Sequence, residues 1–165
     1  MTVNRLHTQL RLLGPSIKLV PDAVANVVAL PSRRRMATRE ELLERLDAAG
    51  ELAPDAPLSF LVVKVVGACH GEHEDQLRRI ANHVTDLVRG TDLVGRMHAH
   101  SFGIVLQGTG VVAAGAVAAR LTHHLNRIAE LSPSLCITVS AATGTGRNAG
   151  TLAVAAMETC EPCCG

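Results

Sequence analysis

Residues 89–106 of this chain read RGTDLVGRMHAHSFGIVL. Two apolar segments within it, residues 93–97 and 102–106, have the length and the Val, Ile and Leu content of β-strands. The short segment His98-Ala99-His100-Ser101 separates them, which predicts a β-hairpin with these residues at its tip. None of them is Gly, Pro, Asn or Asp, so no residue is an obvious turn-former, and the tip is the first candidate for a functional site.

The sequence around this hairpin alternates between helical and strand-like patterns. Thr38 and Glu41 have the spacing of a capping box, which predicts that a helix begins there and ends at Gly50. The spacing of apolar residues predicts further helices at 72–88, 109–131 and 151–158, and strands at 59–66 and 135–142. Gly144, Gly146 and Gly150 predict a loop before the last helix. This order predicts an α/β sandwich in which helices flank a mixed central sheet of about five strands.

Composition indicates a single globular domain with short appendages. The chain has 165 residues, of which 47% are hydrophobic, enough to bury one core. We expect an N-terminal arm or linker at 1–36, a folded domain at 37–158 and a Cys-rich tail at 159–165. Five cysteines are an odd number without the spacing of a disulfide framework, which favours reduced thiols.

Charge and hydropathy argue against several classes of function. The net charge of +1 gives no electrostatic reason for the whole chain to bind nucleic acid or an anionic membrane. The absence of Trp and Tyr removes the side chains on which single-stranded nucleic acid stacks. No apolar run is long enough to span a bilayer, and the N-terminus lacks the pattern of a signal peptide. We therefore expect a cytoplasmic protein that binds neither nucleic acid nor membrane.

Several segments, taken in order, resemble the GGDEF (diguanylate cyclase) family of bacterial signalling domains. The likeness covers residues 30–158, and its order and spacing make it more specific than any one segment. The family's LPNRR-like entry, its LERL and LRR helix segments, its R-x-x-D-L-V-A-R-L segment and its V-T-V-S-I-G strand correspond here to LPSRR at 30–34, LERL at 43–46, LRR at 77–79, RGTDLVGRM at 89–97 and ITVSAA at 137–142. The resemblance implies the α/β fold of nucleotidyl cyclases.

The same resemblance implies that catalysis has been lost. The family's signature G-G-D-E-F corresponds here to His98, Ala99, His100, Ser101 and Phe102, so only the Phe is retained. Joining two GTP molecules requires divalent metal held by carboxylates, but Lys64 stands at the family's metal-binding Asp. The interval from Lys64 to Arg89 is also about seven residues shorter than in the family and lacks its F-K-x-x-N-D helix, which lines the guanine and phosphate pocket. We therefore expect a degenerate GGDEF domain that is not an enzyme.

A cyclic di-GMP site is the first functional hypothesis that follows. Arg89 and Asp92 have the register of the family's inhibitory product-binding site, at which Arg forks to guanine or phosphate and Asp accepts from guanine N–H groups. Arg96, and Arg78 or Arg79, are secondary candidate contacts. In the competing interpretation, Arg89 and Asp92 only end a helix and begin a strand.

Two alternatives of other classes stay open. His98 and His100 at the tip could converge with His70 to hold zinc, and Cys160-x-x-Cys163 in the tail could bind metal or exchange disulfides. The domain could instead be a scaffold that binds a protein partner or a second copy of itself, having lost nucleotide binding. Buried pairing of Arg89 with Asp92 would favour the scaffold.

Overall fold

The computed structural model describes residues 35–67, 73–130 and 135–160, all within one structural unit that begins at Arg35. The elements are α2 (Arg39–Leu52), β1 (Pro57–Val66), α3 (His73–Leu87), β2 (Leu93–His98), β3 (Ser101–Gln107), α4 (Val111–Ala129), β4 (Cys136–Thr145), a 3₁₀ turn η1 (Gly146–Asn148) and α5 (Ala149–Glu158). The predicted order of helices, strands and hairpin is confirmed. The division at residues 36 and 158 stays a prediction, since most of the two outer segments lies outside the described residues.

The fold is α/β, as predicted, but the sheet differs in two respects from the expected one. Within the described residues it has four strands in the order β2-β3-β1-β4, rather than about five, and every neighbouring pair of strands is antiparallel. The helical crossovers do join strands of the same direction, but β3 lies between β1 and β2, and β1 lies between β3 and β4. The parallel contact among these residues is the isolated bridge between Ala37 and Gly95.

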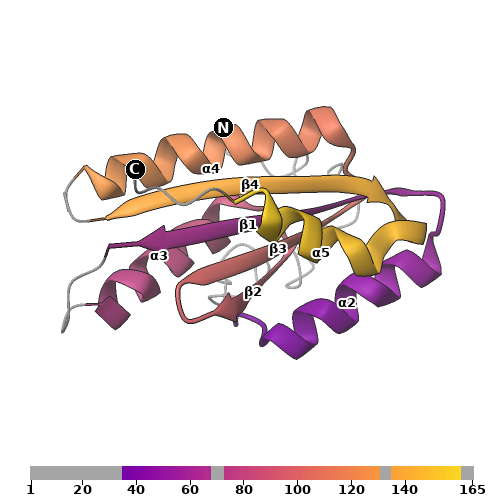
Figure 1. Cartoon of the computed structure of the whole chain (residues 1–165), viewed down its shortest axis with the longest axis horizontal. Coiled ribbons are helices and arrows are strands. Elements are labelled where there is room, and N and C mark those ends of the chain that lie inside the picture. Colours follow the sequence, from indigo (N-terminus) through magenta and orange to yellow (C-terminus); the bar gives the residue numbers. More distant parts are fainter. Residues whose placement is uncertain (1–34, 68–72, 131–134, 161–165) are drawn as a thin grey trace, which may run out of the picture. The chain divides into compact units, whose positions relative to one another are not determined.

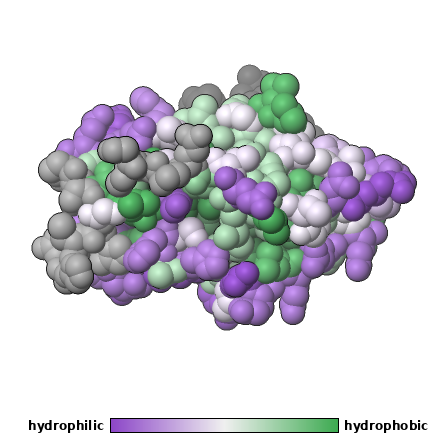
Figure 2. All heavy atoms as spheres, viewed as in Figure 1, coloured by the Kyte–Doolittle hydropathy of each residue, from purple (hydrophilic) through white to green (hydrophobic). Residues whose placement is uncertain are grey.

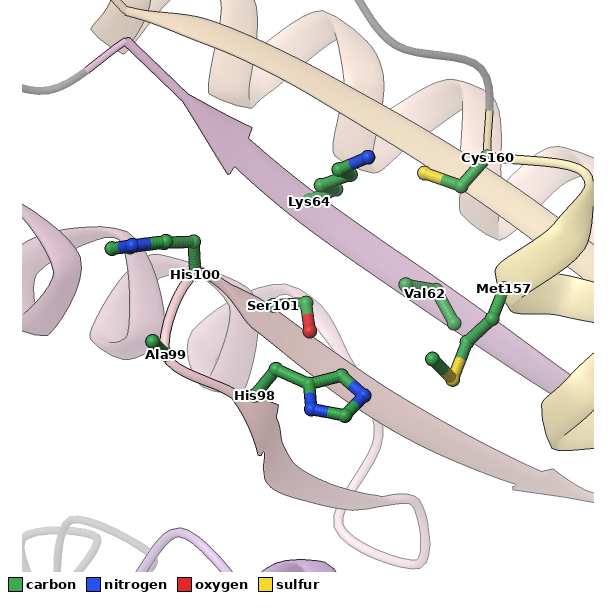
Figure 3. Close-up of a pocket in the computed structure, with 8 residues that line it drawn as sticks. All are labelled: Val62, Lys64, His98, Ala99, His100, Ser101, Met157 and Cys160. Atoms are coloured by element: carbon green, nitrogen blue, oxygen red, sulfur yellow. The ribbon is translucent and has the colours of Figure 1, made fainter.

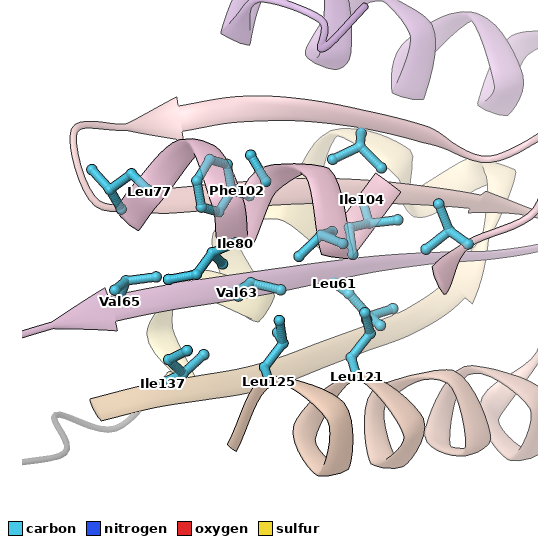
Figure 4. Close-up of a cluster of buried hydrophobic side chains, with 14 of the residues drawn as sticks. Leu61, Val63, Val65, Leu77, Ile80, Phe102, Ile104, Leu121, Leu125 and Ile137 are labelled. Atoms are coloured by element: carbon cyan, nitrogen blue, oxygen red, sulfur yellow. The ribbon is translucent and has the colours of Figure 1, made fainter. Parts of the chain in front are cut away.

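The helices cover both faces of the sheet, with α3 and α4 on one side and α2 and α5 on the other (Figure 1). β1 supplies both cores because its side chains alternate in direction. Leu61, Val63 and Val65 pack in the core beneath α3 and α4 (Figure 4), whereas Leu58, Phe60 and Val62 pack beneath α2 and α5. The predicted reading of this segment as a central buried strand is therefore confirmed.

The glycines that suggested a helix end and a loop have another role. Gly50 lies inside α2, and Gly144, Gly146 and Gly150 fall in β4, η1 and α5, so those two predictions are wrong. A Cβ atom at Gly50 would lie 2.5 Å from the carbonyl oxygen of Gly146 and 2.7 Å from the Cβ of Ala149. Gly50 and Gly146 are thus needed because the backbones of α2 and η1 approach each other closely. The local sequence does not reveal this reason.

The predicted capping box at the start of α2 is confirmed. The Glu41 amide donates to Oγ1 of Thr38 over 3.2 Å, and the Thr38 amide donates to Oε2 of Glu41 over 2.8 Å. Arg35 donates to Oε1 of the same carboxylate over 2.7 Å. The hydrogen bond from the Thr38 backbone, with a smaller contribution from Arg35, lowers the pKa of Glu41 below its ordinary value.

Two further observations concern the cysteines and the membrane. Cys136 is disulfide-bonded, so the expectation of reduced thiols is wrong there, whereas Cys160 is free and buried. Counting cysteines and their spacing does not show which of them meet in space.

Among the described helices, none combines the length and the apolar character that a membrane crossing requires.

We expect Gly50→Ala to lower the free energy of unfolding by about 2 kcal/mol, because the added methyl group would push α2 away from η1. The matched control is Gly115→Ala in α4, where a Cβ would meet nothing within 4 Å. That substitution should stabilise the protein by about 0.5–1 kcal/mol, the ordinary gain of replacing a helical Gly by Ala. Urea denaturation of both variants would show it; equal effects would contradict the close approach of α2 and η1.

We expect Glu41→Ala to destabilise the protein at neutral pH and to matter less in acid. A carboxyl group whose pKa is lowered by folding stabilises the folded state above its unfolded pKa, and this contribution is lost as the pH falls through the folded value. The stability difference from the wild type should therefore shrink as the pH falls below the ordinary value of 4.5. Glu40→Ala, next to it in the first turn, is the control for charge near the helix start. A pH-independent difference would contradict the capping role of the carboxylate.

Candidate functional site

The hairpin that the sequence predicted is present, and its turn is tighter than expected. β2 extends to His98 and β3 begins at Ser101, so only Ala99 and His100 form the turn. His98 pairs with Ser101, and the register shifts between Arg96 and His98, which marks a bulge or irregularity in β2.

Arg96 fastens this turn to the first turn of α3. Its guanidinium lies 3.1 Å and 3.3 Å from the two carboxylate oxygens of Glu74, and it donates to the carbonyl oxygen of Ala99 over 2.8 Å. The sequence suggested Arg96 as a secondary ligand contact, whereas the structure engages its side chain in holding the turn. Glu74 was not predicted, because it lies one helix away in the sequence.

The turn lies against the end of β1 that carries Lys64. The Val65 amide donates to the carbonyl oxygen of His100 over 2.8 Å, and Lys64 is paired directly with Ser101 in the sheet register. Together they border a pocket of about 310 Å³ (Figure 3). Its described lining residues are Val62, Lys64, His98, Ala99, His100, Ser101, Met157 and Cys160. The positions singled out from the sequence on β1 and on the tip thus meet at one place.

Phe102 does not line this pocket. It is buried in the core beneath α3 and α4, because successive residues of β3 point to opposite faces of the sheet. The hairpin tip therefore faces the pocket through Ser101 and the core through Phe102.

Two residues that sequence reasoning did not place in the site close the pocket on the side of α5. Met157 lies in the last turn of α5, and Cys160, which follows it, is buried with its sulfur 3.2 Å from Oγ1 of Thr138. Thr138 is in turn the β4 partner of Lys64. The sequence presented Cys160 as part of a tail motif, and only the packing of α5 on the sheet brings it to the pocket.

The described residues do not gather a metal-binding group. Figure 3 shows the His98 ring beside Ser101, whereas the His100 ring extends away from the other labelled side chains. No cluster of three or more His, Cys, Asp and Glu suited to a metal is found in the part of the chain that the structure describes. His70 and Cys163, which the zinc and tail hypotheses also invoked, lie outside the described residues.

Arg89 and Asp92 form a tight turn between α3 and β2. The Arg89 amide donates to Oδ2 of Asp92 over 2.8 Å, and the Asp92 amide donates to the Arg89 carbonyl oxygen over 3.1 Å. Asp92 is 9% exposed, whereas Arg89 is exposed. The competing interpretation, in which Asp92 makes a turn hydrogen bond, thus matches the geometry, and the same turn places the Arg89 side chain on the surface.

The other candidate arginines lie along the exposed side of α3. Arg78 is 3.4 Å from Asp75, an exposed pair on the same helix, and Arg79 is exposed as well. From α4, Arg120 donates to the carbonyl oxygen of Leu87 over 2.8 Å and so satisfies the last turn of α3, close to Arg89 in the sequence.

Comparisons with known proteins agree on one family. The family model described as "Diguanylate cyclase, GGDEF domain" matches residues 68–158. Among solved structures, a diguanylate cyclase protein from Thermotoga maritima has a TM-score of 0.60 at 20% identity, covering 77% of this chain and 97% of that one. The active GGEEF domain of a Vibrio cholerae diguanylate cyclase has a TM-score of 0.54 at 21% identity, covering 66% and 76%.

A third similar structure is the GGDEF domain of YfiN (TpbB) from Pseudomonas aeruginosa, with a TM-score of 0.52 at 21% identity over 76% of this chain and 92% of that one. At these identities the likeness concerns the fold. No curated protein matches the sequence.

We expect Arg96→Ala to loosen the hairpin turn while leaving the fold intact. The Arg96 side chain is 39% exposed and that of its partner Glu74 is 63% exposed, so the loss of stability should be no more than about 1 kcal/mol. Hydrogen exchange at residues 98–101 should nevertheless accelerate, because the Ala99 carbonyl loses its donor. The control is Arg78→Ala, which removes the exposed ion pair between Arg78 and Asp75 on α3, the helix of Glu74, without touching the turn. Equal exchange in both variants would refute the anchoring role.

Proposed function

Because this chain belongs to the GGDEF family, whose members are typically diguanylate cyclases, we propose that it is a non-catalytic member of this cyclic di-GMP signalling family. The observation that carries the proposal is Lys64. It lines the pocket formed with the hairpin turn, and no carboxylate is among the described residues that line this pocket.

The chemistry of the cyclase reaction needs the opposite electrostatics. Divalent metal ions that neutralise a triphosphate are held by carboxylate and other hard oxygen ligands. At this position Lys64 contributes a positive charge that repels the metal instead of binding it. His98 and Ala99 also stand where the family resemblance implies glycines, so the tip carries side chains where close approach of a nucleotide would require none.

The connection from β1 to α3 supports the same proposal. Only the six residues 67–72 join the two elements. This short connection agrees with the missing segment that the resemblance indicates, in which the family's F-K-x-x-N-D helix lines the guanine and phosphate pocket. A nucleoside triphosphate would thus lose its metal and part of its pocket together.

For the retained function we propose binding of cyclic di-GMP at the turn of Arg89 and Asp92. The turn has one hydrogen bond from the Arg89 amide to the Asp92 carboxylate and one between the two backbones, which hold the start of β2 in place and leave the Arg89 side chain at the surface. A guanidinium can stack on a guanine and donate two parallel hydrogen bonds to its edge or to a phosphate. Asp92 then has a second role: besides its turn hydrogen bond, its carboxylate would accept from guanine N–H groups.

A scaffold that binds a protein partner is the second candidate, and one surface feature favours it. Val111 and Val112 at the start of α4 are 70% and 86% exposed. Figure 2 shows an apolar projection at the upper edge of the molecule, where α4 begins.

Because Asp92 is largely buried and already accepts a hydrogen bond, the dinucleotide site depends on Arg89 more than on Asp92.

Calorimetric titration with cyclic di-GMP should separate the two candidates. We expect binding that weakens by about tenfold or more in Arg89→Ala, since a forked Arg contact to guanine contributes about 1–3 kcal/mol. Arg45→Ala is the matched control, an exposed arginine of α2, which packs on the opposite face of the sheet from α3. GTP with Mg²⁺ should give neither metal-dependent heat nor cyclic di-GMP. If cyclic di-GMP gives no heat, the dinucleotide site is refuted and the scaffold remains as the candidate function. Formation of cyclic di-GMP from GTP would refute the loss of catalysis.

A further inference from the structure

The pocket beside the hairpin turn holds polar groups that the proposed dinucleotide site does not use. Lys64 is the only Lys, Arg, Asp or Glu among the described residues that line it. It is half-buried, and no described carboxylate pairs with it. A half-buried lysine that pairs with no carboxylate among the described residues can attract an anion.

Ser101 and His98 add hydrogen-bonding groups to the same space. Ser101 is only 8% exposed, and it lines the pocket directly opposite Lys64 in the pairing of β3 with β1. In Figure 3 this hydroxyl lies beside the His98 ring, on the side of the pocket opposite Cys160. A serine hydroxyl can donate one hydrogen bond, and a neutral His ring carries one N–H donor. Both groups can thus donate to an anion that Lys64 attracts.

The remaining walls of the pocket are apolar. Val62 precedes Lys64 on the same face of β1, and Met157 covers the pocket from α5 (Figure 3). The Cys160 sulfur is already in contact with the Thr138 hydroxyl. A volume of about 310 Å³ lies at the lower end of small-molecule pockets, roughly 300–1,000 Å³, so the ligand must be compact.

From these groups we infer that the pocket binds a small organic anion directly, without a metal ion: a carboxylate with a short apolar chain. Its carboxylate lies at Lys64, where Ser101 and His98 supply hydrogen bonds, and its chain packs on Val62 and Met157. The replacement of a carboxylate by a lysine thus gives this position affinity for an anion in place of a cation. The pocket shares no residue with the turn of Arg89 and Asp92, so this inference does not rest on the dinucleotide site.

Backbone amide NMR of the full chain, with EDTA present, tests the inference directly. The probes are butyrate, which has both the anion and the chain, butanol, which has only the chain, and inorganic phosphate, which has only the anion. We expect butyrate to give saturable shifts at Lys64 and at residues 98–101, with a dissociation constant of about 1 mM or below. Butanol and phosphate should bind at least about tenfold more weakly. Equal shifts with butanol would reduce the site to an apolar cavity and overturn the inference.

Substitutions then assign the binding to this pocket. Lys64→Met should weaken butyrate binding by about tenfold or more, whereas Lys64→Arg keeps the charge and should retain most of it. Met157→Glu, at a residue 37% exposed, places a negative charge in the pocket wall, which repels the butyrate carboxylate. It should weaken binding as Lys64→Met does, without disturbing the sheet. Arg89→Ala should leave butyrate binding unchanged. Undiminished binding in either Lys64→Met or Met157→Glu, or no saturable shift in the wild type, would overturn the inference.

Discussion

Burial of β1 on both faces is the constraint on which the rest of the structure depends. The strand pairs along nearly its whole length with β3 on one side and β4 on the other, so its backbone polar groups are satisfied within the sheet. Its side chains alternate between the two cores, which fixes where α2 and α5 pack and where α3 and α4 pack. A shift of register by one residue would exchange the two sets of side chains, and Lys64 would then enter the core beneath α3 and α4.

The pocket follows from the unequal extent of the two layers. On the face of α3 and α4, apolar residues of β1 continue to Val65, which is 1% exposed. On the other face, α5 ends at Glu158, and the apolar run of β1 gives way to Lys64 after Val62. Among the described residues, the sheet surface there is bordered by the hairpin turn, by Met157 at the end of α5 and by Cys160. The fold thus provides a hollow at this place, and the side chains of the turn and of β1 decide what it can bind.

Two residues that the sequence suggested as ligand contacts, Arg96 and Asp92, also make hydrogen bonds that stabilise turns of the backbone. Arg96 fastens the hairpin turn to Glu74, and Asp92 closes the turn that leads from α3 into β2. Such roles do not compete with ligand binding in the same way. The Arg96 guanidinium is engaged by three oxygen atoms, whereas Asp92 uses one carboxylate oxygen and thereby presents Arg89 at the surface.

The sequence by itself determined the order of elements, the capping box at Thr38 and the position of the hairpin, because these depend on local periodicity and on contacts within a few residues. It also placed Lys64 and the turn in one site through the family resemblance. Only the tertiary structure decided that the sheet is antiparallel, that Gly50 lies against η1, and that Cys160 and Met157 close the pocket. Each of these depends on segments far apart in the chain, whose meeting is set by how the helices pack on the sheet rather than by any local pattern.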